Sequence, residues 1–354
     1  MKFMIKNWWK LAIGFIAAGT LMFGIAFGLG SRGGSLSMDG NGIHLTSFSN
    51  GSGENNEMVV IDEKSLAEFS SIEVSGFSEK IHLVPSDHYG LEMRTTEENG
   101  LKWDVSGGKL TVKRNAQSGF QIDLINIDLG VFGDRYVTVY YPQGANFDDI
   151  KIDTSSGSVD VSGLTAKNIS INVFSGDVNA DVTLENGNVS IDTSSGDVKF
   201  KSAGNANKVG ISAFSGNVSA DVNDCTELQI GTSSGDITAK SSGQTETKLD
   251  ISAFSGSITA NGNTWRDLKS DTSSGDIDIS GRLMGKSVVN AFSGDVKISV
   301  KGSPSEYGYN LESFSGRIRI DGNKLGKSAQ SNVTGANTIT VDTSSGDITI
   351  NFTN

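Results

Sequence analysis

The chain has 354 residues, including 44 glycines, three prolines and one cysteine, and its formal net charge is −12. The single cysteine excludes a disulfide framework and a zinc site built from several cysteines. The 41 acidic residues outnumber the 29 basic ones. This balance argues against a nucleic-acid-binding protein, which needs clustered Lys and Arg to contact phosphates.

An uncharged apolar segment lies near the start of the chain, after Lys2, Lys6 and Lys10. Its sequence, LAIGFIAAGTLMFGIAFGL, would span about 28 Å as a helix, close to the ~30 Å hydrocarbon core of a bilayer. We therefore predict a transmembrane anchor over residues 11–30, preceded by a short N-terminus of residues 1–10. The lysines place that N-terminus in the cytoplasm and the C-terminal body outside the cell membrane. A cleaved signal peptide is the alternative.

The next segment, residues 31–60, is rich in Gly, Ser and Asn and has no periodicity, which predicts a flexible linker. Residues 1–32 hold four basic residues and no acidic one. The rest of the chain therefore has 25 basic against 41 acidic residues, a net charge of −16. An acidic body of this kind attracts cationic partners.

Short alternating apolar segments begin in residues 61–147. They include IEVSG at 72–76, KLTV at 109–112 and the aromatic-rich YVTVYYP at 136–142. Alternation of this kind is typical of β-strands. We predict an irregular β region that caps a more regular structure formed by residues 148–354.

A Ser-Gly pair repeats about every twenty residues along the second part of the chain. Serine precedes every one of these glycines, and the second residue after each is always Val or Ile. A fixed period of this length is typical of a solenoid. The repeat glycines are Gly157, Gly176, Gly196, Gly216, Gly235, Gly256, Gly275, Gly294, Gly316 and Gly346.

Each repeat consists of two short alternating segments joined by a Ser-Gly turn. The side chains expected to point inward lie seven, five and three positions before the glycine and two and four after it. The fifth position before is apolar in nine of the ten repeats, with Ser270 as the exception. Stacking equivalent strands about 4.8 Å apart would join these positions into one core. We predict an all-β fold, a right-handed parallel β-solenoid of ~20-residue rungs, preceded by one transmembrane helix. A β-propeller is the alternative fold.

Two kinds of repeat alternate, one with Thr-Ser-Ser-Gly and one with Phe-Ser-Gly. Phenylalanines of the second kind would lie two rungs apart, about 9.6 Å, which is too far for direct ring stacking. They either interdigitate with small residues in a corner of the core or form an exposed stripe that binds sugars or amphipathic peptides. The candidate residues are Phe174, Phe214, Phe254 and Phe292.

An acidic residue follows the repeat glycine in most repeats, and a second partial column lies four residues before it, at Asp153, Asp192, Asp271 and Asp342. Stacked carboxylates suggest calcium sites, whereas single Asp residues beside a turn cap backbone groups. The calcium-roll pattern G-G-x-G-x-D is absent, so we predict turn capping, no metal site and no cofactor. The first column contains Asp177, Asp197, Asp236, Asp276 and Asp295, as well as Asp347.

Catalytic motifs are absent from the repeats. All three histidines precede residue 100, and the chain has no G-x-S-x-G elbow, phosphate loop or HExxH motif. Cys225 is predicted to be a free thiol without a catalytic role. We therefore predict a protein that is not an enzyme. The alternative is a β-helix enzyme acting on cell-wall or capsular polysaccharide, and a purely structural spacer is a third class.

The repeated phrases resemble a known family. A strand ending in proline (VTVYYPQG) precedes DTSSGD units that alternate with FSGD units over residues 65–354. This combination resembles the "putative adhesin" family of bacterial envelope proteins, which has a domain of unknown function. The family includes Lia-type proteins linked to cell-envelope stress in Gram-positive bacteria. The resemblance implies a membrane-anchored β-solenoid with relatives that sense or bind antimicrobial peptides, and it brings no catalytic residues.

These observations predict a single-pass membrane protein that displays a non-catalytic β-solenoid outside the cell membrane. The expected role is adhesin-like or belongs to the response to envelope stress and antimicrobial peptides. The expected partners are the membrane itself and cationic peptides or envelope polymers, and nucleic acid is not among them. The predicted interaction surface consists of the phenylalanines and aspartates named above.

Overall fold

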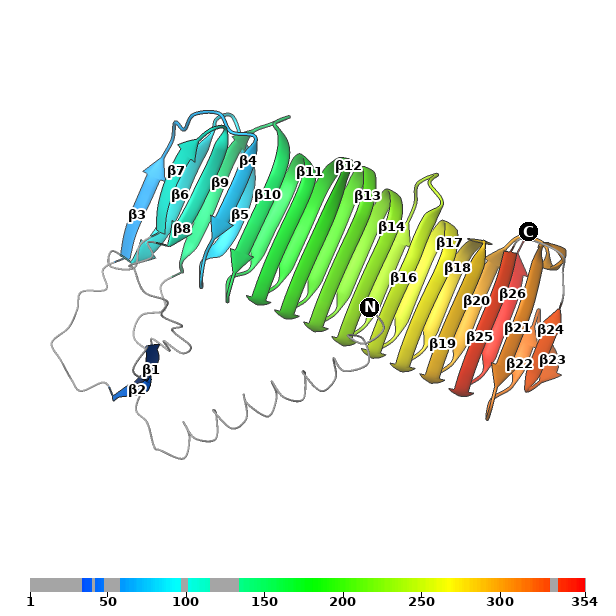
Figure 1. The fold of residues 1–354 in the computed structure, drawn as a ribbon. Helices are drawn as coiled ribbons and strands as arrows, with labels where there is room; N and C mark the ends of the chain where they lie inside the picture. Colours follow the sequence, from blue (N-terminus) through cyan, green and yellow to red (C-terminus); the bar gives the residue numbers. More distant parts are fainter. Residues whose placement is uncertain are drawn as a thin grey trace. The chain divides into compact units, whose positions relative to one another are not determined.

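The structure, a computed structural model, describes residues 34–39, 42–47, 58–96, 101–114, 134–331 and 337–353 (Figure 1). They belong to two units. Of the first, the structure describes one antiparallel pair, β1 (Gly34–Asp39) and β2 (Gly42–Ser47), which lies within the predicted linker. The second unit comprises residues 57–115 and 134–354.

The predicted anchor at residues 11–30 lies outside the described residues. Among the residues that the structure does describe, no helix is both long enough and apolar enough to span a membrane.

The second unit is built almost entirely of strands, which confirms the predicted all-β class. Its first strands are β3 (Met58–Glu63), β4 (Ser71–Ser75), β5 (Lys80–Ser86), β6 (Gly90–Thr96), β7 (Leu101–Ser106), β8 (Lys109–Arg114) and β9 (Tyr136–Pro142). The central strands are β10 (Asn146–Thr154), β11 (Val159–Ser175), β12 (Val178–Ser195), β13 (Val198–Ser215), β14 (Val218–Ser234), β15 (Ile237–Ser241), β16 (Thr247–Ser255), β17 (Ile258–Ser274), β18 (Ile277–Met284), β19 (Lys286–Ser293) and β20 (Val296–Lys301). The last elements are a 3-10 helix, η1 (Pro304–Glu306), and β21 (Tyr307–Ser313), β22 (Ile318–Ile320), β23 (Asn323–Gly326), β24 (Ser328–Ser331), β25 (Asn337–Ser345) and β26 (Ile348–Thr353).

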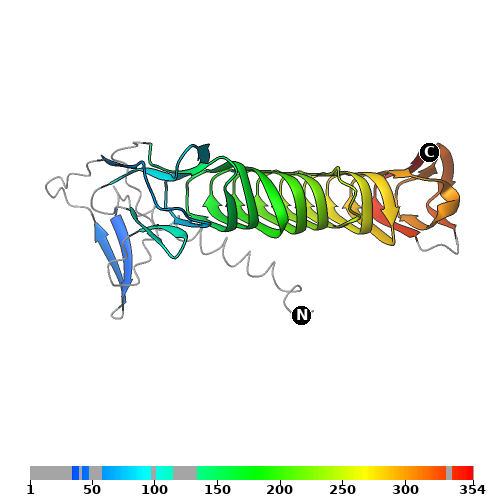
Figure 2. The same cartoon turned by 90° about the horizontal axis from the view of Figure 1, so that it is seen from above.

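The central strands pair in parallel from one repeat to the next, so the chain coils as a β-solenoid, as predicted. Figure 2 shows these rungs stacked in a row along one axis. We name each rung by its repeat glycine. The right-handed sense of the coil stays a prediction.

The predicted inward positions form the core. In rung 196 they are occupied by Val189, Ile191, Thr193, Val198 and Phe200, and each side chain is at most 6% exposed. The same columns are buried in the neighbouring rungs because the strands stay in register. Alternation along each strand places every second residue inside.

At the fifth position before the repeat glycine, one residue breaks the apolar pattern. Ser270 is fully buried in the core, and its hydroxyl has no hydrogen-bond partner. The sequence exception is thus a buried polar group among apolar neighbours, which costs stability.

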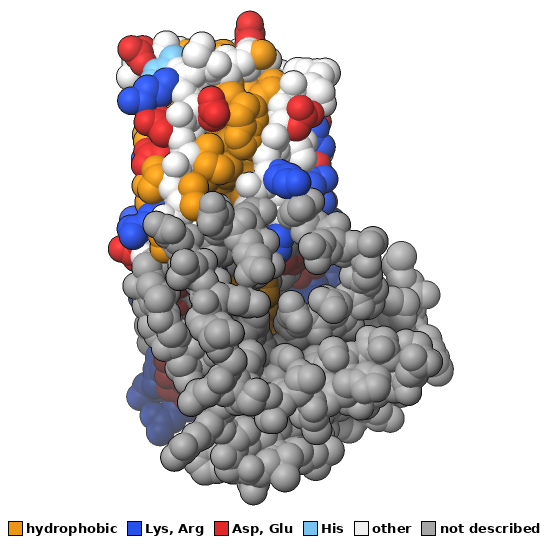
Figure 3. Space-filling model, turned by 90° about the vertical axis from the view of Figure 1, so that its left-hand side faces the viewer, with side chains coloured by type: hydrophobic (Ala, Val, Ile, Leu, Met, Phe, Trp, Pro, Cys, Tyr) orange, Lys and Arg blue, Asp and Glu red, His pale blue; other side chains and the backbone are white. Residues whose placement is uncertain are grey.

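The N-terminal strands join the same stack. β4 pairs in parallel with both β8 and β10, and β5 pairs in parallel with both β9 and β11. The parallel ladder therefore begins before residue 148. Antiparallel pairs of β3, β6 and β9 and of β7 and β8 close this end. Figure 3 faces it and shows hydrophobic side chains gathered between charged ones.

The order of rungs in space differs from their order in the sequence at the C-terminal end. β25 pairs in parallel with β19 on one side and with β21 on the other, and β26 lies between β20 and β22 in the same way. The last rung of the chain is therefore inserted between two earlier ones, as the red strands in Figure 1 show.

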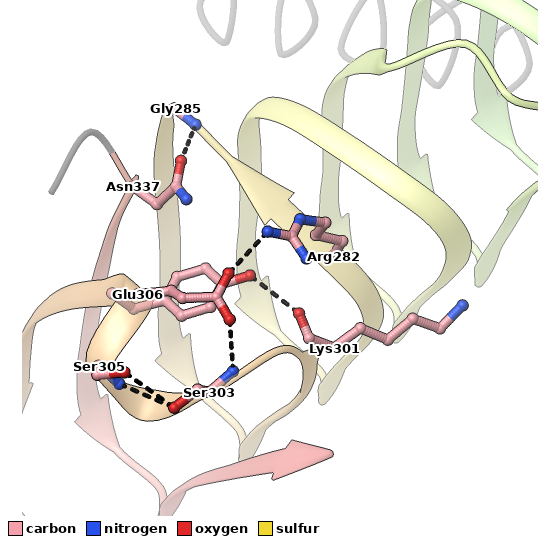
Figure 4. A network of polar contacts seen from close by, with 8 residues as sticks. Arg282, Gly285, Lys301, Ser303, Ser305, Glu306 and Asn337 are labelled. Carbon is pink, nitrogen blue, oxygen red and sulfur yellow. Dashed lines mark hydrogen bonds and ion pairs between the residues drawn. The ribbon is translucent and has the colours of Figure 1, made fainter. Parts of the chain in front are cut away.

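A polar network fixes the connection at which the chain leaves the regular order (Figure 4). After β20, Ser303 and Glu306 form a capping box around η1, and the backbone N–H of Ser303 donates to Glu306 at 2.8 Å. Arg282, from an earlier rung, pairs with the same carboxylate at 2.7 Å. The Tyr307 hydroxyl donates to the carbonyl of Lys301 at 3.0 Å. These contacts fix the start of β21 so that it skips the next place in the stack. That place, beside β19 and β20, is occupied by β25 and β26.

The inserted rung restores a pattern that the sequence order breaks. Rungs 294 and 316 both carry Phe-Ser-Gly and follow each other in the sequence, whereas rung 346 carries Thr-Ser-Ser-Gly. Because rung 346 lies between them in space, the two kinds alternate without a break across the ten glycine-named rungs.

Candidate functional site

The candidate site is a shallow trough on one outer face of the solenoid. It has a volume of about 810 Å³ and runs from Lys109 of β8 across β4, β10 and the last parts of β11 to β14, ending on β16. Its middle is lined by small side chains or none, which leaves the backbone of several rungs close to solvent. These residues are Ser170, Ser190, Gly210, Ser212, Gly231 and Ser252.

A column of exposed aromatic rings lies on the same face. The phenylalanines of this column are Phe174, Phe214, Phe254, Phe292 and Phe314, which are 68%, 48%, 69%, 69% and 80% exposed. The interpretation in which the rings fill a corner of the core is therefore wrong. The rings are exposed as a stripe, and binding of sugars or amphipathic peptides to it stays a prediction. We call these five residues the phenylalanine stripe.

The stripe and the trough belong to one surface. Ser212 and Ser252 line the trough, and each lies two residues before a stripe phenylalanine on its strand. Side chains two apart along a strand point to the same face. On the intervening rungs the equivalent position is serine, at Ser194, Ser233, Ser273 and Ser344.

A cation lies beside the ring at each end of the face. Phe77, whose carbonyl accepts the Ser155 backbone N–H at 3.1 Å, belongs to the rung before rung 157. The Arg114 guanidinium lies 5.1 Å from the centroid of its ring. At the other end, the Lys327 ammonium lies 5.9 Å from the ring of Phe314. Within the described part of the chain, the four rings between them have no cation over their faces.

The β4 end of the trough holds a cluster of charges that the sequence analysis missed. The Glu73 carboxylate is paired with Lys109, with Lys113 at 2.9 Å and with Lys151 at 3.9 Å. Hydrogen bonds from Lys109 and Lys113 lower the pKa of Glu73 from 4.5 to about 2. The side chains come from three adjacent strands, so only the stacking brings them together.

This cluster predicts a stability change at acidic pH. The pKa of Glu73 is lower in the folded chain, so its stabilisation is complete above pH 4.5 and is lost as the pH falls toward 2. Because the lysines are half exposed, solvent screens the pairs, and we expect Glu73 to add about 2 kcal/mol to the free energy of unfolding at pH 7. Unfolding curves of the wild type and Glu73→Gln should differ at pH 7 and converge near pH 2. A constant difference over this range would contradict the prediction.

The predicted acidic column beside the glycines forms a ladder of hydrogen bonds between rungs. Oδ1 of Asp197 accepts the backbone N–H of Asn217 at 2.7 Å, and Oδ1 of Asn217 accepts that of Asp236 at 2.9 Å. Asp177, Asp236, Asp276 and Asp295 make the same contact to the next rung in space. The carboxylates thus cap backbone groups of the following rung, beyond the corner glycine, and line none of the trough.

The ladder predicts different outcomes for two substitutions at one position. Asp236→Ala leaves the Ser257 N–H without its acceptor and is expected to cost about 1 kcal/mol of unfolding free energy. Asp236→Asn should cost less than about 0.5 kcal/mol, because Asn217 already makes this contact in the same column. Denaturant unfolding of both variants is the measurement. Equal losses would show that the contact does not stabilise the stack.

Other reactive groups are not gathered at the site. Cys225 is a buried free thiol, and burial raises its pKa to about 11. Nδ1 of His82 lies 3.4 Å from Oδ2 of Asp160, and Nδ1 of His88 lies 2.6 Å from Oδ1 of Asp87. Both histidines therefore have carboxylate partners, which the sequence alone did not indicate. Among the described residues, no group of three or more His, Cys, Asp and Glu could hold a metal ion.

Comparison with known proteins identifies one family. The profile of the family described as Toastrack DUF4097 matches residues 69–202 and 183–351. No curated protein matches the chain.

Several solved structures align with most of the chain at low identity. A "putative lipid binding protein" from Parabacteroides distasonis is 15% identical with a TM-score of 0.37, over 85% of this chain and 98% of its own. A "putative adhesin" from Bacteroides fragilis is 16% identical with a TM-score of 0.23, over 84% and 98%. Another, from Parabacteroides merdae, is 13% identical with a TM-score of 0.27, over 85% and 98%. Likeness at this level carries no argument about function.

Proposed function

Because the chain belongs to the Toastrack DUF4097 family, we propose that its solenoid is a non-catalytic interaction domain that binds an elongated partner in an adhesin-like role. One observation carries this proposal. Large aromatic rings that are half to four-fifths exposed form a column beside a trough that crosses several rungs. Exposing such rings to water is unfavourable, and surfaces of this kind mark binding sites.

The proposal includes display outside the cell membrane, on an anchor at residues 11–30 with the N-terminus in the cytoplasm. The uncharged segment and its three flanking lysines support this placement. Protease added to intact cells should degrade the C-terminal body. If the C-terminal body stays protected from the protease, it lies inside the cell and the proposed topology is wrong.

The proposed partners are cationic peptides or envelope polymers. The net charge of −16 outside residues 1–32 supports attraction of cationic molecules. A role in the response to envelope stress rests on the DTSSGD and FSGD phrases alone. A strain that lacks the protein should then be more sensitive to cationic antimicrobial peptides than its parent, and equal sensitivity would remove this part of the proposal.

The interaction role is tested with the phenylalanine stripe. In the four-ring variant, Phe174, Phe214, Phe254 and Phe292 are replaced by alanine. We expect it to lose at least about tenfold in affinity for the bound polymer or peptide. Its melting temperature should stay close to that of the wild type, because exposed side chains contribute little to stability. The matched control replaces Ser194, Ser233 and Ser273, on the intervening rungs, by alanine.

The binding assay uses envelope polymers, host glycans and cationic peptides immobilised in parallel, with the intact chain as analyte. Retention that the four-ring variant loses and the serine control keeps supports the proposal. Equal binding by all three proteins would show that the stripe is not the site. Release of reducing sugar from any polymer would overturn the non-catalytic role in favour of a polysaccharide-degrading enzyme.

A further inference from the structure

We propose that the ligand of the phenylalanine stripe is an extended, uncharged, β-linked polysaccharide that lies along the solenoid axis with every second sugar on a ring. This inference rests on the proposed interaction role and specifies its ligand. It follows from the spacing of the rings, from the polar groups beside them and from the charges at the two ends of the face.

The spacing of the rings is set by the fold. Stripe phenylalanines occupy every second rung in space, including rung 316, which the inserted rung 346 separates from rung 294. Two rungs correspond to about 9.6 Å. In an extended β-linked glycan, alternate sugars present the same face, and the two-sugar repeat is about as long as this step. Rings at this interval can each stack on an equivalent sugar face.

The trough beside the rings is suited to hydroxyl-rich ligands. It is lined by Ser212, Gln229 and Ser252, among other residues. These side chains donate and accept hydrogen bonds. A sugar has apolar C–H faces and a rim of hydroxyls, so it uses both an aromatic ring and its polar neighbours.

An extended proline-rich peptide has a similar repeat, about 9.3 Å per turn, but it requires a different surface. Grooves for such peptides are lined with aromatic side chains, and here no two stripe rings are close enough to form a pocket for one side chain, since a serine rung separates each pair. A polyanionic polymer is disfavoured by the net charge of −16 outside residues 1–32 and by acidic residues of the neighbouring column such as Asp192.

The positions of the two cations at the ends of the face define the length of ligand that the stripe can bind. Phe77 and Phe314 each have a cation beside the ring, and no cation of the described residues lies over the four rings between them. Three intervals of two rungs span about 29 Å. A glycan that covers all four of these rings with alternate sugars therefore contains seven sugars.

The chain-length dependence of binding tests this geometry in the unaltered protein. Chito- and cello-oligosaccharides of two to eight sugars are titrated by calorimetry against the full chain. Affinity should rise in steps at three, five and seven sugars, each by up to about tenfold, as one further ring is engaged. It should level off beyond seven. A smooth rise without steps, or no gain beyond three sugars, would overturn the proposed register.

A second test shifts one ring and keeps the number of rings. The double variant Phe254→Ser with Ser233→Phe moves a ring by one rung, and Phe254→Ala removes it. Both should lower the affinity for a seven-sugar ligand by at least about tenfold, and Ser233→Ala should leave it unchanged. If the double variant binds the seven-sugar ligand as tightly as the wild type does, the two-rung spacing of the rings does not determine affinity and the proposed register is wrong.

Control ligands separate failure of this inference from failure of the proposed function. Maltoheptaose, whose α-linkages curve the chain, and a polyproline peptide should bind at least about tenfold more weakly. Ring-dependent binding of either one in preference to the β-linked glycan would overturn the ligand assignment and keep the interaction role. Loss of ring dependence for every ligand would remove both.

Discussion

Replacing Gly235 by alanine is expected to destabilise the solenoid by about 4 kcal/mol. The backbone of Gly235 has φ +142°, a conformation that residues with a side chain rarely adopt. A Cβ built at this position lies only 2.1 Å from the carbonyl oxygen of Gly216 in the adjacent rung. The rungs would have to separate locally, which would also weaken the hydrogen bond from the Gly235 N–H to Ser255 at 3.0 Å.

The same rung offers a matched control at Gly231, near the end of β14. Its added Cβ would have no neighbour nearer than 3.7 Å, the Ser252 hydroxyl oxygen, and its φ is not in the strained range. The free energy of unfolding of Gly231→Ala should therefore lie within about 0.5 kcal/mol of the wild-type value, or be slightly higher than it. Denaturant melts of both variants decide the matter. Similar stabilities would show that close backbone approach at the corner is not required.

Removing the residues after 331 is expected to cost at least about 6 kcal/mol of local stability at the C-terminal end. The deletion takes away β25 and β26, which contribute the fully buried side chains of Ile339, Val341, Ile348 and Ile350. Although these strands end the chain, they lie inside the stack between rungs 294 and 316. Their loss leaves a gap with apolar surfaces on both sides.

Limited proteolysis of the shortened chain should cut within residues 296–331, which the full chain protects. Leu325→Ser in the exposed β23 is the control and should leave protection unchanged, because that side chain is 41% exposed. Hydrogen exchange on the full chain provides an independent measurement. Amides of β25 should exchange as slowly as those of β19, and rapid exchange in β25 would contradict its interior position.

The sequence predicted the rung and its inward columns because both depend on local alternation and on a regular period. Val189, Ile191 and Val198 are buried as their spacing from Gly196 indicates. The exposure of Phe254 follows the same alternation, because Ala253, three positions before Gly256, is buried and the next side chain therefore points outward. The alternation does not show what such an exposed ring binds.

Two further features depend on contacts between distant residues. Glu73, Lys113 and Lys151 are far apart in the sequence and meet only because β4 lies between β8 and β10. The insertion of rung 346 depends on the connection around Glu306. The sequence does contain an indication of it, since the alternation of Phe and Ser rungs is broken at Gly316 and is restored only if the last two rungs exchange places.

The strict alternation of two kinds of rung limits how such a chain can change its copy number. Gain or loss of a single rung would place two phenylalanine rungs, or two serine rungs, next to each other and would interrupt the spacing of the rings. Gain or loss of a pair would lengthen or shorten the surface and leave every remaining interval unaltered. The unit that can be gained or lost without disturbing the ring spacing is therefore the rung pair, seen in the glycines Gly157, Gly196, Gly235 and Gly275, which are 39 or 40 residues apart.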